Sequence, residues 1–240
     1  ALLAGVGAGS RSDVEPVRAQ VLAPSDPGYA PTQPARLRPE DAYALLAEVG
    51  FVSPPREPGD DAPVPMLTRN GSTLAVRVGA PENDDTAAAV ASTVVDQLRD
   101  AGIDASVVRL QADELYGEAS TDGTVDAIVG WVAAGLDPGT ALASRFGCPP
   151  GPGGESAPLV SNTADLCDPT LQPIIDGVLR GELPLDQQLD ELEPKLWQLN
   201  SVLPIMQDMT VVAAGGDVGG VDLAGPIQTG IFGDADHWTR

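Results

Sequence analysis

The feature that most constrains the fold is a regular alternation of strand and helix patterns within residues 73–131. Runs rich in β-forming residues occur at 73–78, 105–110 and 125–131, and helical patterns separate them. Neighbouring parallel strands need such crossover segments, which then cover the faces of the sheet. The alternation therefore predicts an α/β fold with a mostly parallel sheet flanked by helices.

The helix between the first two strands carries clear start and stop signals. Residues 81–86 supply side-chain oxygens and acidic groups that favour a helix N-terminus. Val90, Val94 and Leu98 then recur every four residues, so one face of the helix is apolar. Gly102 stands where a glycine commonly ends a helix. We therefore expect this helix to pack on the sheet.

Further elements are predicted around this core. Residues 66–68 should pair with 73–78 as a hairpin across an Asn-Gly turn. Pro194 should kink or divide the last predicted helix. The remaining predicted helices lie at 39–49, 113–118, 140–146, 169–180 and 185–199, and the remaining strands at 202–206 and 210–214.

The chain of 240 residues is long enough for one large domain or two small ones. Residues 1–38 carry little periodicity and read as an extended, loop-rich segment. Residues 39–221 are predicted to form an α/β lobe, and residues 222–240 a glycine-rich tail. The first residue is not Met, so we expect a processed or trimmed piece of a longer protein.

Charge limits the classes of partner. The chain has 35 acidic and 13 basic residues, a net charge of −22 at pH 7. Such a surface repels phosphate backbones and anionic lipid headgroups, so no nucleic-acid partner is expected. The plainer interpretation of the acidity is a solubilising surface. No run of 18 apolar residues is present, and no membrane span is predicted.

Few residues suit catalysis or metal binding. The single histidine, His237, lies in a polar tail, so a Ser-His-Asp or Cys-His arrangement is not expected. Lys195 is the one lysine, and the glycine pairs near residue 216 lack the spacing of a dinucleotide site. No Cys-x-x-Cys motif occurs. The sequence predicts a protein without enzymatic activity, metal or cofactor.

The two cysteines leave two alternatives open. Cys148 and Cys167 lie 19 positions apart and flank a loop rich in glycine and proline. In an exported protein they would form a disulfide, with about 3 kcal/mol of stabilisation on the chain-entropy estimate. In a cytosolic protein they would be two unrelated thiols. Their spacing alone does not decide between these alternatives.

Trp131 is a candidate ligand-binding residue because it ends a predicted parallel strand. Ligands of open α/β sheets bind outside the carboxyl ends of the strands, where an aromatic ring can stack on them. A tryptophan of the core or of a lobe interface is the alternative, with equal weight. Trp197 lies within a predicted helix and is expected in the core.

Four segments in order resemble the C-terminal half of the family 5 extracytoplasmic solute-binding proteins, the oligopeptide-, dipeptide- and nickel-binding receptors of ABC importers. They are residues 39–51, 91–106, 125–131 and 202–214, and the whole resemblance covers residues 21–221. It implies a protein of about twice this length, with two lobes and a ligand cleft between them. Residues 1–38 would then belong to the hinge or the other lobe, and the site would be incomplete here.

The resemblance also implies export, usually with a lipid anchor, and hence a Cys148–Cys167 disulfide. In peptide-binding members an aspartate three residues after the tryptophan pairs with the peptide's amino terminus. Ala134 occupies that position here, and of the later pattern only Asp137 remains. A buried ammonium without its carboxylate is costly, so ordinary peptide import is disfavoured. Trp131, Ala134 and Asp137 are the predicted ligand-binding positions.

Within the family, residues 23–29, 146–148 and 225–226 together with Trp238 resemble actinobacterial lipoproteins of the LpqW type. That resemblance implies control of the balance between phosphatidylinositol mannosides and lipoarabinomannan in the cell envelope. The predicted function is a non-enzymatic regulator of this type. Its partners would be a glycolipid-precursor or other small ligand and an envelope glycosyltransferase. The alternative is a peptide-binding receptor that partners a membrane transporter.

Overall fold

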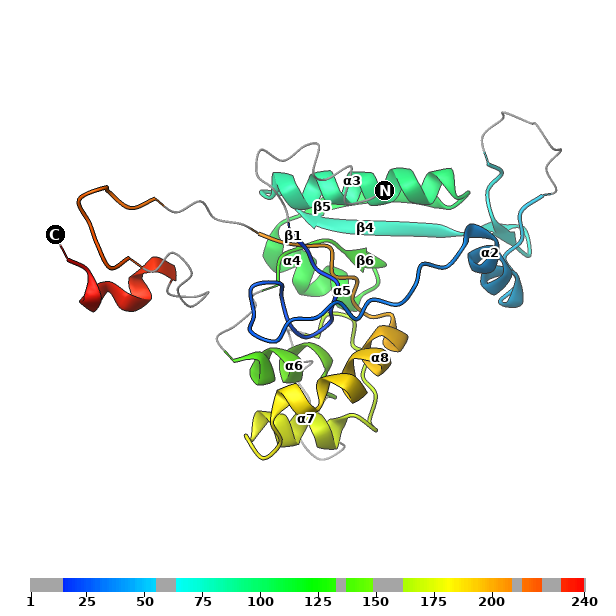
Figure 1. The fold of residues 1–240 in the computed structure, drawn as a ribbon. Helices are drawn as coiled ribbons and strands as arrows, with labels where there is room; N and C mark the ends of the chain where they lie inside the picture. The colour runs from blue at the N-terminus through cyan, green and yellow to red at the C-terminus, as the bar shows by residue number, and fades with distance from the viewer. Residues whose placement is uncertain are drawn as a thin grey trace. The chain divides into compact units, whose positions relative to one another are not determined.

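The computed structural model describes residues 15–54, 64–132, 137–148, 162–208, 213–221 and 230–239 (Figure 1). The chain divides into two compact units. The described part of unit 1 runs from residue 35 to residue 131, and unit 2 combines residues 15–34 with the described residues after 131. The predicted division of the chain into segments 1–38, 39–221 and 222–240 stays a prediction.

Unit 1 holds the α/β core. Its elements are α2 (Pro39–Glu48), β2 (Thr68–Arg69), β3 (Ser72–Thr73), β4 (Ala75–Pro81), α3 (Asp85–Asp100), β5 (Asp104–Leu110), α4 (Ala112–Tyr116), α5 (Glu118–Thr121) and β6 (Ala127–Ile128).

The sheet of unit 1 has the strand order β5-β4-β6, and both pairings are parallel. Strand β4 is central, with Ala75 opposite Asp104 and Pro81 opposite Leu110. On its other side, only Val78 and Gly79 pair with β6. The predicted parallel sheet flanked by helices is confirmed.

Helices cover both faces of this sheet (Figure 1). Helix α3 packs through Ala87, Ala91 and Val95 against β4, where Val78 and Ala80 are fully buried. Leu115, Ala119 and Val125 form a separate cluster with α4 and α5 on the opposite face.

Local signals explain the ends of α3 and the hairpin. Asp84 is the N-cap of α3 and accepts a hydrogen bond of 2.9 Å from the Ala87 N–H. Gly102 follows the helix with φ of +78°, a conformation that favours glycine. Asn70 and Gly71 both have positive φ between β2 and β3, as a two-residue hairpin turn requires. These predictions are confirmed.

Three predictions in unit 1 need correction. The third strand, predicted over residues 125–131, pairs only at Ala127–Ile128, and as an edge strand it has β4 as its single neighbour. The first strand begins at Ala75 rather than Thr73. The helix predicted at 113–118 is two short helices that meet at Gly117.

Unit 2 is mostly helical. Its elements are β1 (Glu15–Pro16), α6 (Pro138–Phe146), α7 (Gln172–Leu179), the 3-10 helix η1 (Leu185–Gln187), α8 (Leu189–Leu199), β7 (Met206–Gln207) and the 3-10 helix η2 (Gly230–His237). Strands β1 and β7 form a short antiparallel pair. The core unites α6, α7 and α8, with Phe146, Ile175, Leu192 and Leu196 almost completely buried.

Residues 15–34, here called the strap, are attached to α8 by one buried carboxylate. Glu193 is 2% exposed. Its two oxygens accept hydrogen bonds from the Gln20 N–H at 3.0 and 2.9 Å and from the Val21 N–H at 2.9 Å. The Thr32 hydroxyl donates to the same carboxylate at 2.5 Å and accepts from the Trp197 indole N–H at 3.0 Å. Trp197 is therefore a half-buried residue with a polar partner.

Unit 2 also departs from the predicted elements. Helix α8 continues through Pro194, and the break lies earlier, at Gln188 between η1 and α8. The helix predicted from residue 169 begins at Gln172. The strand predicted at 202–206 is reduced to Met206–Gln207. Much of the strand predicted at 210–214 lies outside the described residues.

Replacing Glu193 with glutamine should lower the free energy of unfolding by about 1–3 kcal/mol, because an amide nitrogen cannot accept the strap's N–H groups. Urea unfolding of Glu193→Gln against the native chain measures this change. Glu191→Gln is the matched control, since Glu191 lies on the same helix and pairs with Lys195 in a solvent-exposed ion pair. Equal effects of the two substitutions would contradict the role of Glu193.

Candidate functional site

The carboxyl edge of the parallel sheet carries the first candidate site. Trp131 follows β6 and is 46% exposed, so it is not a core residue of unit 1. Tyr116, at the end of α4, lies against Gly130, where a Cβ atom would overlap its hydroxyl group. Glycine at 130, the residue before Trp131, therefore leaves room for the Tyr116 hydroxyl. Sequence reasoning identified Trp131 but missed Tyr116.

Tyr116 is a hydroxyl donor over the whole physiological pH range. Partial burial raises its pKa above the ordinary value, and the negative charge of Asp84 raises it further. Asp84 is the N-cap of α3, in the short turn that follows β4. The carboxyl ends of β4 and β6 thus present a protonated phenol, a carboxylate and an exposed indole ring.

Polar groups continue along this edge to β5. The Arg109 guanidinium donates to the Glu82 carbonyl oxygen, and the Gln111 amide donates to the Glu82 carboxylate. Arg109 also lies 3.9 Å from Asp85 in an exposed ion pair. An aromatic ring beside planar donors and acceptors can bind the apolar face and the hydroxyl groups of a polyol, or a peptide backbone.

Of the other two predicted ligand-binding positions, Ala134 and Asp137, the structure describes only Asp137. Ala134 lies outside the described residues. Asp137 is the N-cap of α6, and its carboxylate accepts hydrogen bonds from the Thr140 hydroxyl at 2.6 Å, the Thr140 N–H at 2.8 Å and the Gly139 N–H at 3.3 Å. These bonds, above all that of the Thr140 hydroxyl, hold the pKa of Asp137 below its ordinary value. The carboxylate has a structural role that the sequence analysis did not predict.

Asp137 also stands at a pocket of about 410 Å³ within unit 2. The pocket lies between the strap, the N-terminus of α6, the end of α7 and the segment that leads into α8. Leu183, Leu185 and Leu189 line it and are half-buried. Sequence reasoning missed this pocket. Leu185 and Leu189 were predicted only as part of a helix, and the strap that completes the walls lies about 150 positions earlier in the chain.

Unit 1 has a pocket of about 460 Å³ beside α2. Apolar side chains dominate its lining, among them Ala47, Phe51, Val52 and Leu67. The Tyr43 hydroxyl, its one ionisable group, donates to the Ala101 carbonyl oxygen at 3.1 Å. This pocket offers no arrangement of groups for chemistry.

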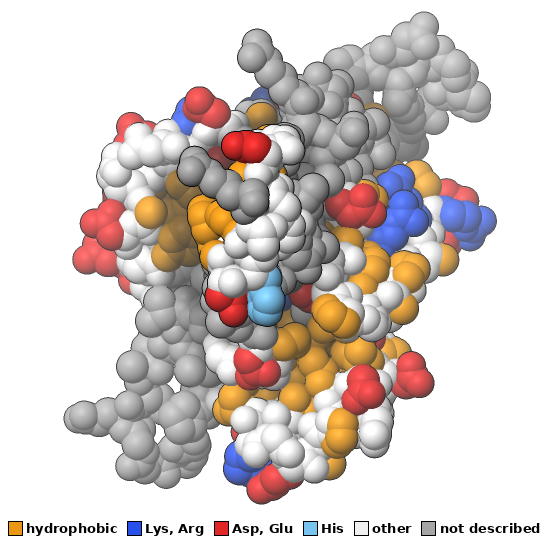
Figure 2. Space-filling view, turned by 60° about the vertical axis from the view of Figure 1, so that its left-hand side comes forward, with side chains coloured by type: hydrophobic (Ala, Val, Ile, Leu, Met, Phe, Trp, Pro, Cys, Tyr) orange, Lys and Arg blue, Asp and Glu red, His pale blue; other side chains and the backbone are white. Residues whose placement is uncertain are grey.

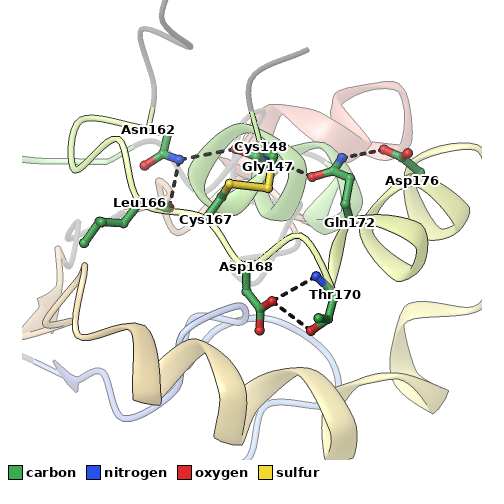
Figure 3. Close-up of a disulfide and its surroundings, with 9 residues drawn as sticks. All are labelled: Gly147, Cys148, Asn162, Leu166, Cys167, Asp168, Thr170, Gln172 and Asp176. Atoms are coloured by element: carbon green, nitrogen blue, oxygen red, sulfur yellow. Dashed lines mark hydrogen bonds between the residues drawn. A yellow bond between two sulfur atoms is a disulfide. The ribbon is translucent and has the colours of Figure 1, made fainter. Parts of the chain in front are cut away.

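The structure contains the Cys148–Cys167 disulfide, with the Cα atoms 5.1 Å apart (Figure 3). Asn162, which is 7% exposed, donates its amide to the carbonyl oxygens of Gly147 and Leu166 at 3.3 and 3.1 Å. The Gln172 side chain accepts a hydrogen bond of 2.7 Å from the Cys148 N–H. Asn162 thus links the backbone before the two cysteines, and Gln172 holds Cys148 at the start of α7.

The described residues contain no group of three or more His, Cys, Asp and Glu side chains placed to hold a metal ion. His237 is exposed and contacts the neighbouring Asp236 at 3.1 Å.

None of the helices in the described part of the chain has the length and apolar character needed to cross a membrane. Acidic side chains are spread over the face drawn in Figure 2, with few basic ones between them.

Comparison with known proteins identifies a relative along the entire chain. In an alignment of 298 positions, the chain is 37% identical to the probable monoacyl phosphatidylinositol tetramannoside-binding protein LpqW of Mycobacterium tuberculosis. The chain is a homologue of LpqW. The alignment spans all of this chain and 47% of LpqW, so the chain covers about half the length of that relative. No protein-family model matches the chain.

Solved structures show the same fold. AppA of Bacillus subtilis, in complex with a nonapeptide, superposes with a TM-score of 0.62 and 14% identity, over 99% of this chain and 44% of AppA. NikA of Brucella suis, in complex with Fe(III)-EDTA, gives a TM-score of 0.59 and 20% identity, over 85% of this chain and 38% of NikA. The predicted resemblance to family 5 solute-binding proteins and to LpqW is confirmed. The likeness to the solved structures establishes the fold alone.

Asp137→Ala should lower the free energy of unfolding by about 1 kcal/mol, because α6 loses its N-cap. Asp137→Asn should change it less, since asparagine is a comparable cap. A carboxyl group with a lowered pKa stabilises the fold above its ordinary pKa, and the effect disappears as the pH falls through the folded-state value. The difference between Asp and Asn in urea unfolding should therefore vanish in acid. A greater loss in Asp137→Asn than in Asp137→Ala would contradict the capping role.

A Cys148→Ser, Cys167→Ser double variant should lose about 3 kcal/mol of stability relative to the oxidised chain. Thermal unfolding with and without a thiol reductant measures this loss. The reductant should destabilise the native chain to the same extent and leave the double variant unchanged. Two free thiols in the oxidised native protein would overturn the assignment.

Proposed function

We propose that this chain is part of a non-enzymatic, extracytoplasmic binding protein that recognises a mannosylated phosphatidylinositol and regulates cell-envelope glycolipid synthesis. The single observation that carries the proposal is the 37% identity to LpqW along the whole chain. The printed name of that relative states a monoacyl phosphatidylinositol tetramannoside as its ligand. The proposed regulation would act on the balance between phosphatidylinositol mannosides and lipoarabinomannan.

The carboxyl edge of the sheet supports a sugar ligand. Trp131 offers an exposed ring on which the apolar face of a sugar can stack. Tyr116, Asp84 and Glu82 lie along the same edge and can donate or accept hydrogen bonds to sugar hydroxyls. In the proposed protein this edge faces a cleft completed by the part of the protein beyond this chain.

The non-enzymatic character of the proposal rests on the relatives, which are binding proteins by their printed names. Catalysis by acyl transfer or hydrolysis needs a nucleophile or water activated by a nearby base. His237 is exposed and contacts the acidic Asp236 in a 3-10 helix, and Cys148 and Cys167 are bonded to each other. We further propose a lipid anchor on the precursor, and a glycosyltransferase of the envelope as the protein partner.

The alternative is the peptide-binding receptor of an ABC importer, with Asp137 holding the peptide's amino terminus. It is favoured by the exposure of the Asp137 carboxylate. Against it, that carboxylate already accepts three hydrogen bonds as the cap of α6, and Ala134 replaces the aspartate of peptide-binding members. We therefore rank the glycolipid ligand first.

The test is ligand binding by the intact, cell-derived protein that carries this chain. Calorimetry should detect the purified tetramannoside and no binding of a mixed nonapeptide library. Trp131→Ala should weaken tetramannoside binding about tenfold, because the sugar would lose the aromatic ring that it covers on binding. Phe232→Ala is the matched control, because Phe232 is also an exposed aromatic residue, at 69%, and belongs to η2 of unit 2 rather than to the sheet of unit 1.

Peptide binding that is lost in Asp137→Asn would replace the proposal with the receptor alternative.

The regulatory part has its own measurement: deletion of the gene in the source organism should change the ratio of phosphatidylinositol mannosides to lipoarabinomannan. An unchanged ratio in the deletion strain would overturn the regulatory role and leave a binding protein.

A further inference from the structure

We infer that the pocket of unit 2 binds the hydrocarbon chain of an amphiphile whose headgroup at the pocket mouth is an uncharged polyol. This inference rests on the proposed function and assigns a site to the apolar part of its ligand. The pocket volume of about 410 Å³ falls within the range of about 300–1,000 Å³ that is typical of small-molecule sites.

Five of the residues that line the pocket have aliphatic side chains, and the others are Pro27, Gly28, Asp137, Pro138, Gly139 and Asp186. Leu22 from the strap and Val178 from α7 are 6% and 8% exposed. Leu183, Leu185 and Leu189 are half-buried and also line the pocket, so their apolar surface is only partly covered by the protein. A hydrocarbon chain would remove that surface from water, which is the main driving force for such binding.

Two glycines make the pocket walls compact. At Gly139, in the first turn of α6, a Cβ atom would lie 3.1 Å from Val178 Cγ1, so glycine allows α6 to approach α7 closely. At Gly177, a Cβ atom would lie 2.7 Å from Leu183 Cδ1, so glycine allows Leu183 to fold over α7. The walls are therefore held by close packing, as a preformed site requires.

Charge selects the headgroup. Asp137 and Asp186 are the charged residues among those that line the pocket, and its described lining contains no basic side chain. The lowered pKa of Asp137 keeps its carboxylate ionised. Two carboxylates repel the headgroup of a free fatty acid or a phosphate at the same place, and they accept hydrogen bonds from hydroxyl groups. The chain should therefore be attached to a polyol, with any phosphate of the ligand farther away.

A series of alkyl glucosides tests this inference by calorimetry with the 240-residue chain, at concentrations below micelle formation. Methyl glucoside should not bind measurably. From butyl to octyl glucoside, the affinity should rise about fourfold for each methylene group that becomes buried. Octanoate should bind at least about tenfold more weakly than octyl glucoside, because its carboxylate meets Asp137 and Asp186. An affinity independent of chain length, or equal for octanoate, would overturn the inference.

Variants locate the site. Leu189→Gln should weaken octyl glucoside binding about fivefold or more, because it places an amide on the pocket wall. Leu179→Gln is the matched control, since Leu179 is 48% exposed on α7 and does not line the pocket. Asp186→Asn should raise octanoate affinity while Asp190→Asn, a surface change on α8, should not. Equal effects of Leu189→Gln and Leu179→Gln would mean adsorption on exposed apolar surface and would overturn the inference.

If Leu189→Gln fails to fold, Leu185→Gln serves the same purpose, because Leu185 lies in the short η1 helix and is half-buried. The intact protein separates this inference from the proposed function. Tetramannoside binding that Leu189→Gln leaves unchanged would overturn the pocket assignment and keep the function. Octyl glucoside binding with no tetramannoside binding would overturn the function and keep the pocket as a site for hydrocarbon chains.

Discussion

The interaction on which unit 2 most depends is the acceptance of two backbone N–H groups and a hydroxyl by the buried Glu193 carboxylate. A buried carboxylate without hydrogen bonds would be strongly destabilising, so Glu193 and the strap stabilise each other. The same contact fixes Leu22, which belongs both to the helical core and to the wall of the aliphatic pocket. One polar interaction thus determines the shape of an apolar site.

In unit 1 the corresponding constraint is the central position of β4. Its parallel pairing with β5 and β6 brings the ends of all three strands to one edge, where Trp131, Tyr116 and Asp84 lie. The two candidate sites therefore differ in physical character. The sheet edge is polar and aromatic, as suits a sugar, whereas the pocket of unit 2 is aliphatic, as suits a hydrocarbon chain.

Local sequence signals predicted most of the α/β core, because its elements depend on neighbouring residues. The N-cap at Asp84 and the glycine at 102 define α3 without help from distant contacts. The length of β6 could not be predicted, because it depends on its pairing with β4, which lies far earlier in the chain and pairs with β6 only through Val78 and Gly79. The position of Trp131 was predictable from topology, whereas Glu193 looked like one of 35 acidic residues, since its partners lie 173 positions away.

The same separation along the chain has a consequence for biogenesis. The described part of unit 1 lies within residues 35–131, so its core can form once that stretch has emerged from the ribosome. Unit 2 needs residues from both ends, because Gln20 must wait for Glu193. Closing so long a loop is slow relative to local folding. Until α8 has been synthesised and has folded, the N–H groups of the strap lack the Glu193 carboxylate. The leucines of unit 2 then remain accessible to chaperones, proteases and ligands.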